Sequence, residues 1–258
     1  MKQVPKTDVD LEIDSPKDRL KENNLVFDVN EFDDYALEAA LQLKEQHGAD
    51  VTLLTMGPNR ARETMHVGLA KGADRAIHLD DSAFEEADAY ATSNVLTHIL
   101  KKLHYDLILT GVEATDDIYG QVGVTIAEKL GLAHATVVTK LDLEEGGKRI
   151  RVRRELGGGL LEVMDVSLPA VLTIQLGIYK LRYASMRGIA KARQKEIKTL
   201  KLADVGLSPE QVGKSGSKVK LREIYFPPKG KGAEIIAGKP EEAARTLMEK
   251  LRVQAKVL

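Results

Sequence analysis

Segments with the pattern of a helix alternate with short aliphatic runs between residues 30 and 131, and the connections between them are short. The runs at 51–55, 76–79 and 106–110 are the expected strands, and the stretches between them carry apolar residues at helical spacing. Before the first of these strands we expect a helix with its cap at Asn30 and its end at Gly48. Strands that alternate with helices in this way form a parallel sheet covered on both faces. We therefore predict an α/β fold with a doubly wound, mostly parallel sheet.

The spacing of apolar residues changes after Gly131, because glycine turns then separate runs with the pattern of strands. These runs predict an antiparallel hairpin extension of the sheet, with one more apolar strand after it. The expected strands are 135–143, 149–156, 160–166 and 168–176.

The last third of the chain has a lower density of apolar residues from position 178 on, and only 241–253 predicts a helix there. Such a segment cannot bury itself well, so we expect an arm that packs on another subunit. We divide the chain into an α/β nucleotide-binding domain at 1–189 and a C-terminal arm at 190–258.

The composition excludes several classes of protein. The 258 residues carry a net charge of -1, which argues against a nucleic-acid binder, and the aromatic content of 4% without Trp argues against base stacking. The absence of Cys excludes disulfides and thiolate chemistry. The sequence has no pattern of a signal peptide or membrane span, so we expect a cytoplasmic protein, with an organelle matrix after processing as the alternative.

The loop that follows the expected strand at 106–110 is the strongest candidate site. Ligands of doubly wound sheets bind beyond the carboxyl ends of strands, and the next helix begins near Gly120 and Gly123. Free amides at a helix start favour a phosphate. The alternative is that Asp116 or Asp117 caps the helix while the glycines allow close packing, and spacing alone gives the two interpretations even weight.

Other motifs carry little weight. Gly213-Lys214-Ser215 resembles the end of a P-loop, but Ser208 stands where a P-loop has Gly. The six histidines include no pair at the spacing of helical metal ligands, and no serine lies in a nucleophile elbow. We therefore predict no metal site and no catalytic residues.

The motifs taken in order resemble the β subunit of electron transfer flavoproteins over nearly the whole length. The shared motifs are Lys2-Gln3-Val4-Pro5, Asn30-Glu31-Phe32-Asp33, Thr55-Met56-Gly57-Pro58, Leu69-Ala70-Lys71-Gly72-Ala73-Asp74, Ala114-Thr115-Asp116-Asp117, Gln121-Val122-Gly123, Leu168-Pro169-Ala170-Val171-Leu172-Thr173 and Arg182-Tyr183-Ala184-Ser185-Met186. The fold implied is Rossmann-like, of the adenine nucleotide α-hydrolase type.

The resemblance implies an electron carrier rather than an enzyme, in a heterodimer with an α subunit that shares FAD with this chain. It also implies a nucleotide held by this chain itself, either AMP or, in bifurcating members, a second FAD. Many AMP-binding members have Asn where this chain has Gly120, so a second FAD stays open. The implied cofactor-binding residues are Lys2, Gln3, Asn30, Phe32, Asp33, Met56, Gly57, Gly111, Glu113, Ala114, Thr115, Asp116, Gly120, Gln121, Val122, Gly123, Val124 and Thr125.

The resemblance also implies a docking loop for acyl-CoA-type or other dehydrogenases at residues 182–189, with a quinone oxidoreductase as a further possible partner. Arg182 and Tyr183 lie in this loop and Met186 is its anchor, whereas Glu155 matches an acidic position beside the flavin. The alternatives are that Met186 is a core residue of the following helix and that Glu155 points outward from a hairpin.

The start of the chain differs from that of the family. Members of the family have a short apolar run before the motif Lys2-Gln3-Val4-Pro5, so we expect either a misassigned start or a sheet that lacks part of its central first strand.

The alternative function, from a different class, is a universal-stress-type adenine-nucleotide sensor with the same doubly wound fold.

Overall fold

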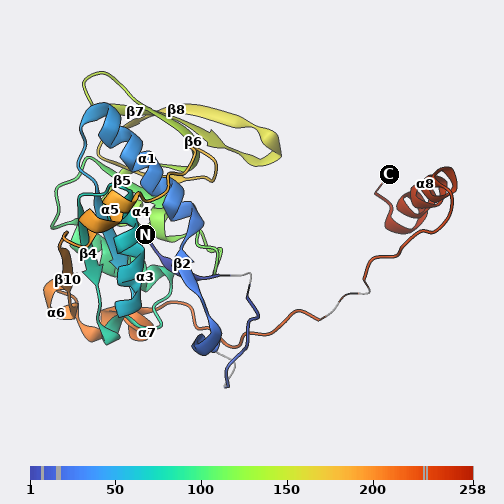
Figure 1. Ribbon diagram of the computed structural model, residues 1–258, viewed down its shortest axis with the longest axis horizontal. Coiled ribbons are helices and arrows are strands. Elements are labelled where there is room, and N and C mark those ends of the chain that lie inside the picture. The colour runs from blue at the N-terminus through green and yellow to red at the C-terminus, as the bar shows by residue number, and fades with distance from the viewer. Residues whose placement is uncertain (7–8, 16–18, 229, 231, 258) are drawn as a thin grey trace.

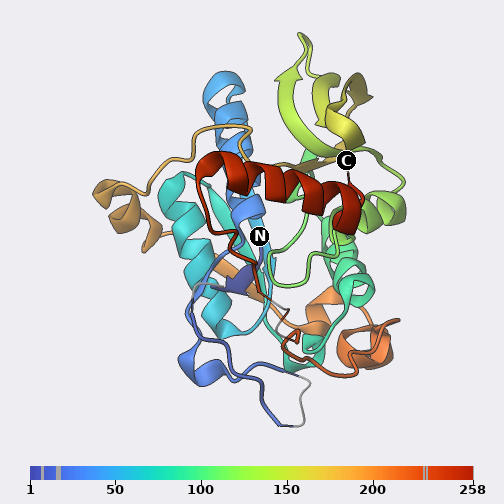
Figure 2. The ribbon, with the colours of Figure 1, turned by 90° about the vertical axis from the view of Figure 1, so that its right-hand side faces the viewer.

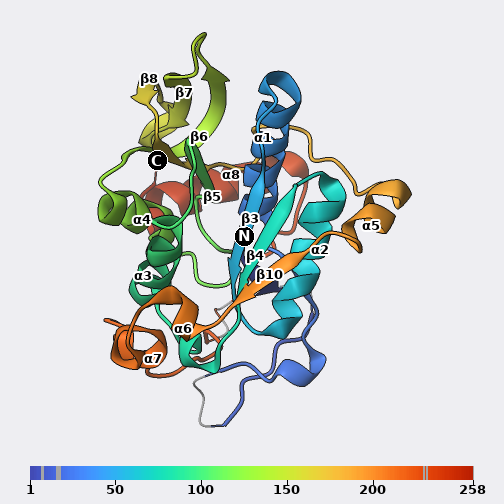
Figure 3. The ribbon, with the colours of Figure 1, turned by 90° about the vertical axis from the view of Figure 1, so that its left-hand side faces the viewer.

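The computed structural model describes residues 1–6, 9–15, 19–228, 230 and 232–257. Its first sheet is parallel and consists of β3 (Thr52–Met56), β4 (Arg75–Leu79) and β10 (Ile197–Leu200), in the order β10-β4-β3. Neighbouring residues of β4 pack on different helices, Ala76 with α2 (Arg62–Lys71) and Ile77 with α3 (Ala89–Leu100). Because successive side chains of a strand point to opposite faces, these helices cover the two sides of the sheet, as Figure 3 shows.

The second sheet has the strand order β5-β9-β6-β7-β8. Strands β5, β9 and β6 run parallel, whereas β6, β7 and β8 form the antiparallel hairpins that the glycine turns predict. The strand bounds are β5 Leu107–Gly111, β6 Ala133–Leu143, β7 Arg149–Glu155, β8 Leu161–Ser167 and β9 Ala170–Ile174. The α/β class and the hairpin extension are confirmed.

The parallel strands form two sheets where we expected one. Strand β3 ends the first sheet and β5 ends the second, and no described strand pairs with both of these edges. Strand β1 (Gln3–Pro5) pairs instead with β2 (Phe27–Val29) in a separate antiparallel ribbon. The Met1 amino group still donates to Leu54 O at 2.9 Å, so the start of the chain lies against the edge of β3.

Helix α1 (Glu31–His47) holds the two sheets together. Its residues Ala36 and Leu43 belong to the core of the second sheet, whereas Leu37 and Leu41 belong to the core of the first. The helix begins after Asn30 and ends at Gly48, whose φ of 73° is the left-handed conformation that favours glycine at a helix end. Figure 1 shows α1 alongside both groups of strands.

Helix α4 (Val122–Leu130) lies on the face of the second sheet opposite α1. There Ile126 and Ala127 pack with Val171 of β9 and Leu100 of α3. The short helical turns are η1 Glu22–Asn24, η2 Asn59–Ala61, η3 Ser82–Phe84, η4 Gly157–Gly159 and η5 Pro209–Gln211. None of the helices formed by the described residues has the length and apolar character needed to cross a membrane.

Part of the segment assigned to the arm packs on the domain. Strand β10 joins the first sheet, and Val205 and Val212 are buried in its core. Three short helices accompany them, α5 (Met186–Ala192), α6 (Leu202–Val205) and α7 (Gly213–Gly216). The packing differs from the division at residue 190 because the apolar residues between 197 and 212 are irregularly spaced and follow neither a helical nor a strand period, so the sequence does not reveal their burial.

The segment beyond residue 219 has the character of an arm. Helix α8 (Pro240–Glu249), which continues into a π-helical turn η6 (Lys250–Ala255), has no buried residue. Figure 1 shows it well apart from the sheets at the end of an extended segment, and Figure 2 shows it in front of them. Positions 229, 231 and 258 of the predicted arm lie outside the described residues.

Candidate functional site

The first turn of α1 lies at the carboxyl ends of β3 and β5, where Asn30 connects three segments of the chain. Its side-chain amide donates to Glu113 O at 2.8 Å, and its Oδ1 accepts from the Thr115 amide at 3.1 Å. Its backbone amide donates to Lys2 O at 2.9 Å. The expected helix cap is therefore at the right position, but its side chain holds the loop after β5 instead of capping α1.

Asp33 makes a second connection one turn further along α1. Its Oδ2 accepts from the Lys2 amide at 2.7 Å and its Oδ1 accepts from the Gly111 amide at 2.9 Å. The side chain is buried, and hydrogen bonds to an ionised acceptor are stronger than neutral ones. Asn30 and Asp33 thus tie the N-terminal segment and the end of β5 to one helix start.

Gly111 is the residue that lets α1 come this close to β5. A Cβ built on Gly111 would lie 2.5 Å from the Cβ of Phe32 and 3.0 Å from the backbone nitrogen of Asp33. Ordinary contacts between carbon atoms are about 3.5–4.0 Å, so only glycine fits here. The predicted site residues Phe32 and Gly111 therefore contribute through packing.

Lys2 closes the site with two ion pairs to the loop after β5. Its Nζ lies 2.6 Å from Asp116 and 2.9 Å from Asp117. Burial lowers the pKa of Lys2, but hydrogen bonds and attraction from Asp116 and Asp117 outweigh burial, and the pKa is raised. The two carboxylates are thereby compensated by a cation, which makes this loop less repulsive to an anionic ligand.

The start of α4 uses its two glycines in different ways. A Cβ on Gly123 would lie 2.6 Å from the Oγ1 of Thr110 and 2.7 Å from the Cγ2 of Thr173, so close helix–sheet packing explains this glycine. Gly120 has a φ of 59°, and a Cβ there would meet only Val112 O at 3.6 Å. The left-handed backbone conformation thus favours glycine at position 120. Helix α4 begins after Gln121, and its first turn includes the predicted residues Val124 and Thr125. No side chain of the described residues caps this helix, so the first amides of the turn are free.

A cleft of about 2380 Å³ opens at these strand ends and continues between the edges of β3 and β5. The predicted residues that line it are Lys2, Asn30, Asp33, Met56, Gly57, Gly111, Glu113, Ala114, Gly120, Gln121, Val122 and Gly123. The other predicted residues, Gln3, Phe32, Thr115, Asp116, Val124 and Thr125, belong to the same segments but do not line it.

Gln3 follows Lys2 in the chain but does not itself line the cleft. Its side-chain nitrogen donates to Arg60 O at 3.0 Å, whereas its Oε1 is buried and has no hydrogen-bond partner among the described residues. A buried acceptor without a partner is costly, but this oxygen has no exposed surface through which a ligand in the cleft could reach it. The start of α4, in contrast, lines the cleft and fits the phosphate of a ligand.

His78 of β4 holds the turn after β3 in place and was not among the predicted site residues. Its Nε2 lies 2.9 Å from Gly57 O, and the ring is fully buried. Burial lowers the pKa of His78 although the Gly57 carbonyl opposes this, so the neutral ring donates to Gly57 O. Met56 and Gly57 are therefore held in place at the rim of the cleft.

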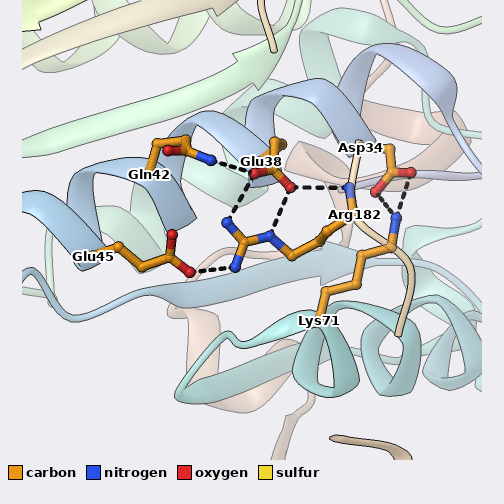
Figure 4. A network of polar contacts seen from close by, with 6 residues as sticks. All are labelled: Asp34, Glu38, Gln42, Glu45, Lys71 and Arg182. Atoms are coloured by element: carbon orange, nitrogen blue, oxygen red, sulfur yellow. Dashed lines mark hydrogen bonds and ion pairs between the residues drawn. The ribbon is translucent and has the colours of Figure 1, made fainter. Parts of the chain in front are cut away.

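The predicted docking residues fall into two groups. Tyr183 and Met186 are 94% and 84% exposed, so the alternative that Met186 is a core residue does not describe this chain. Glu155 is exposed at the end of β7 and accepts a hydrogen bond from Gln175 at 3.1 Å. Arg182 differs, because Glu38 and Glu45 of α1 occupy its guanidinium, as Figure 4 shows.

Glu38 and Glu45 are thus the partners that the sequence analysis missed. Glu38 is a charged residue between the apolar positions Leu37 and Ala39 of α1, and its side chain is 3% exposed. A charged residue on the buried side of a helix indicates a buried ion pair, but the sequence does not say with which residue.

Comparisons with known proteins identify a family and several relatives of this chain. Residues 19–205 match the electron transfer flavoprotein domain family. The electron transfer flavoprotein subunit β of Methylophilus methylotrophus is 40% identical over 249 residues, 96% of this chain and 94% of that protein. The corresponding subunit of Bacillus subtilis is 35% identical, over 93% of this chain and 91% of that protein.

A third relative is the caffeyl-CoA reductase-Etf complex subunit CarD of Acetobacterium woodii, which is 37% identical over 97% of this chain and 95% of that protein. These matches confirm the resemblance, and the alternative of a universal-stress-type sensor is set aside. The chain therefore belongs to the electron transfer flavoprotein family, in which it is a β subunit and an electron carrier rather than a catalytic enzyme.

Proposed function

We propose that this electron-carrying subunit holds an adenine nucleotide in the cleft at the carboxyl ends of β3 and β5. The observation that carries the proposal is the set of hydrogen bonds through which Asn30 and Asp33 hold Lys2, Gly111, Glu113 and Thr115 around one helix start. These contacts position main-chain groups from segments far apart in sequence, as a binding site requires and core packing does not.

Two groups then recognise opposite ends of the nucleotide. The free amides at the start of α4, beside Gly120, bind its phosphate, and the main-chain groups that Asn30 and Asp33 position contact its adenosine. The proposed nucleotide is AMP or, in a bifurcating assembly, the adenine half of a second FAD. The left-handed conformation of Gly120 is one that Asn also tolerates, so its φ does not favour either nucleotide.

The second proposed function is assembly with an electron transfer flavoprotein α subunit, with FAD shared between the two chains. The arm supports this proposal, because Leu247, Met248 and Val253 lie exposed on α8 and its continuation. An amphipathic helix without a buried face is typical of a segment that docks on a partner. FAD supplies the redox chemistry when bound, and this chain contributes part of its surroundings, including Glu155.

The third proposed function is docking onto acyl-CoA-type or other dehydrogenases through residues 182–189, with electrons passed on to an acceptor such as a quinone oxidoreductase. Met186 is the proposed anchor, since a flexible thioether adapts to pockets of different shape. The A. woodii relative is a subunit of a caffeyl-CoA reductase-Etf complex, which supports a partner that acts on a CoA ester. We propose the cytoplasm as the location.

The test of the nucleotide proposal is to purify the heterodimer, denature it and separate the released nucleotides. We expect one FAD and one AMP per heterodimer for simple electron transfer and two FAD for bifurcation. The variant Asn30→Ala, which releases Glu113 and Thr115 from the helix start, is expected to reduce the content of the second nucleotide while leaving the shared FAD unchanged. A heterodimer with one FAD and no other nucleotide would remove this proposal.

A further inference from the structure

The chain between β9 and α5 crosses the outer side of α1, and one arginine fastens it there. Glu38 Oε2 accepts from the Arg182 backbone amide at 3.3 Å and from its Nε at 2.8 Å, and Glu38 Oε1 accepts from its Nη2 at 2.8 Å. Gln42 also donates to Glu38 Oε1 at 2.8 Å. Figure 4 shows the carboxylate of Glu38 facing the guanidinium of Arg182, with two hydrogen bonds between them.

The guanidinium of Arg182 donates three of its five N–H groups to carboxylates of α1. Its Nη1 donates to Glu45, so that each of its three nitrogens has a carboxylate partner on α1. Such forked pairs fix the geometry of both side chains. The pair with Glu38 is already satisfied within the chain, and a partner's carboxylate that displaced Glu38 would leave a buried charge without a partner.

The other end of the exposed segment is fastened to a different helix. Ser185 caps α5 by accepting from the Gly188 amide at 3.0 Å. A Cβ on Gly188 would lie 2.2 Å from Ala70 O, so α5 packs directly on the backbone of α2. Between these two anchors Tyr183 and Met186 project outward, at 94% and 84% exposure.

We propose that Arg182 is a positioning residue of the docking segment: its pairing with Glu38 holds residues 183–186 in the conformation that presents Tyr183 and Met186, and its guanidinium does not itself bind the dehydrogenase. The inference rests on the proposed docking function. It differs from that function in assigning Arg182 to the support of the segment rather than to its contact surface.

The first readout needs no dehydrogenase. Amide hydrogen exchange of residues 182–186 in the intact heterodimer is expected to become about tenfold faster or more in Glu38→Gln and in Arg182→Gln, because the segment loses one of its two anchors. The matched control is Asp34→Asn, which removes a different ion pair of α1. Asp34 pairs with Lys71 at 2.6 Å, and neither residue belongs to the docking segment. It is expected to leave this exchange unchanged.

The second readout is reduction of the heterodimer by an acyl-CoA dehydrogenase supplied with its acyl-CoA. We expect the KM for the heterodimer to rise about tenfold in Glu38→Gln and in Arg182→Gln, with kcat and nucleotide content within twofold of the parent. Arg182→Gln leaves a buried carboxylate unpaired, so the double variant Glu38→Gln/Arg182→Gln repeats the test without that charge. Arg182→Lys is expected to recover part of the loss.

The outcomes separate the two proposals. A raised KM in Arg182→Gln with a parental KM in Glu38→Gln means that Arg182 binds the partner directly, which overturns the positioning role, as does unchanged exchange in both variants. Met186→Ala is expected to raise the KM without changing exchange. If Met186→Ala leaves the KM unchanged while Glu38→Gln still accelerates exchange, the docking function fails and the anchor by Arg182 stands.

Discussion

The substitution Gly111→Ala tests the geometry of the nucleotide site with a single added methyl group. This methyl would lie 2.5 Å from the Cβ of Phe32, 2.9 Å from its carbonyl carbon and 3.0 Å from the Asp33 nitrogen. Two of these atoms are backbone, so the first turn of α1 must move by about 1 Å to restore ordinary contacts.

The displacement has a calculable cost. The Gly111 amide now donates to Asp33 Oδ1 at 2.9 Å, and a shift of about 1 Å takes the pair beyond hydrogen-bond distance. A buried amide without a partner costs about 1–3 kcal/mol, and overpacking costs about 1–3 kcal/mol. We therefore expect the free energy of unfolding to fall by about 2–6 kcal/mol, compared with the roughly 5–15 kcal/mol that stabilises a typical domain.

The assay compares Gly111→Ala with Gly157→Ala, whose added Cβ would meet no atom within 4 Å. Urea unfolding gives the stability of each variant, and extraction gives its nucleotide content. We expect Gly111→Ala to lose stability and most of its second nucleotide, while Gly157→Ala keeps both. Parental stability and nucleotide content in Gly111→Ala would refute the argument that α1 must approach β5 this closely.

Three further predictions concern the docking segment, pH and the arm. Met186→Ala is expected to weaken binding of a dehydrogenase about tenfold, measured by titration, and a parental affinity would contradict the anchor. Burial raises the pKa of Glu38, but Arg182 and Gln42 outweigh it and the pKa lies below its ordinary 4.5. The pair therefore stabilises the fold above about pH 4.5 and loses this effect as pH falls through the folded-state pKa, so Glu38→Gln is expected to flatten the acid side of the unfolding curve. A chain ended at Gly238 is expected to keep the parental urea midpoint, since α8 buries nothing, but to lose assembly with an α subunit in size-exclusion chromatography.

Local sequence signals predicted the elements whose causes are local. The helix expected from Asn30 to Gly48 is observed at Glu31–His47, because its apolar spacing and its terminal glycine act within the segment itself. The short strand β10 was missed, because its pairing with β4 is a contact between distant segments and its own four residues include only two apolar ones. A short strand among charged residues has no distinctive local pattern.

The site likewise combines features that local sequence signals predict with contacts between segments far apart in the sequence. Asn30 is at the predicted helix start, but its side chain holds Glu113, which lies 83 positions away in the sequence, and no local pattern contains that contact. Glu38 and Arg182 are 144 positions apart, so each is visible in the sequence only as a charge in an unusual place. The resemblance to a family was what brought Arg182 into view, and the contacts then changed the role that we propose for it.

The most direct test of the central claim is a count of nucleotides in the intact heterodimer, with the β subunit isolated after mild dissociation and analysed separately. We predict one adenine nucleotide, AMP or FAD, that remains with this chain in addition to the FAD shared with the α subunit. A heterodimer that carries electrons with a single FAD and releases no other adenine nucleotide would contradict the account.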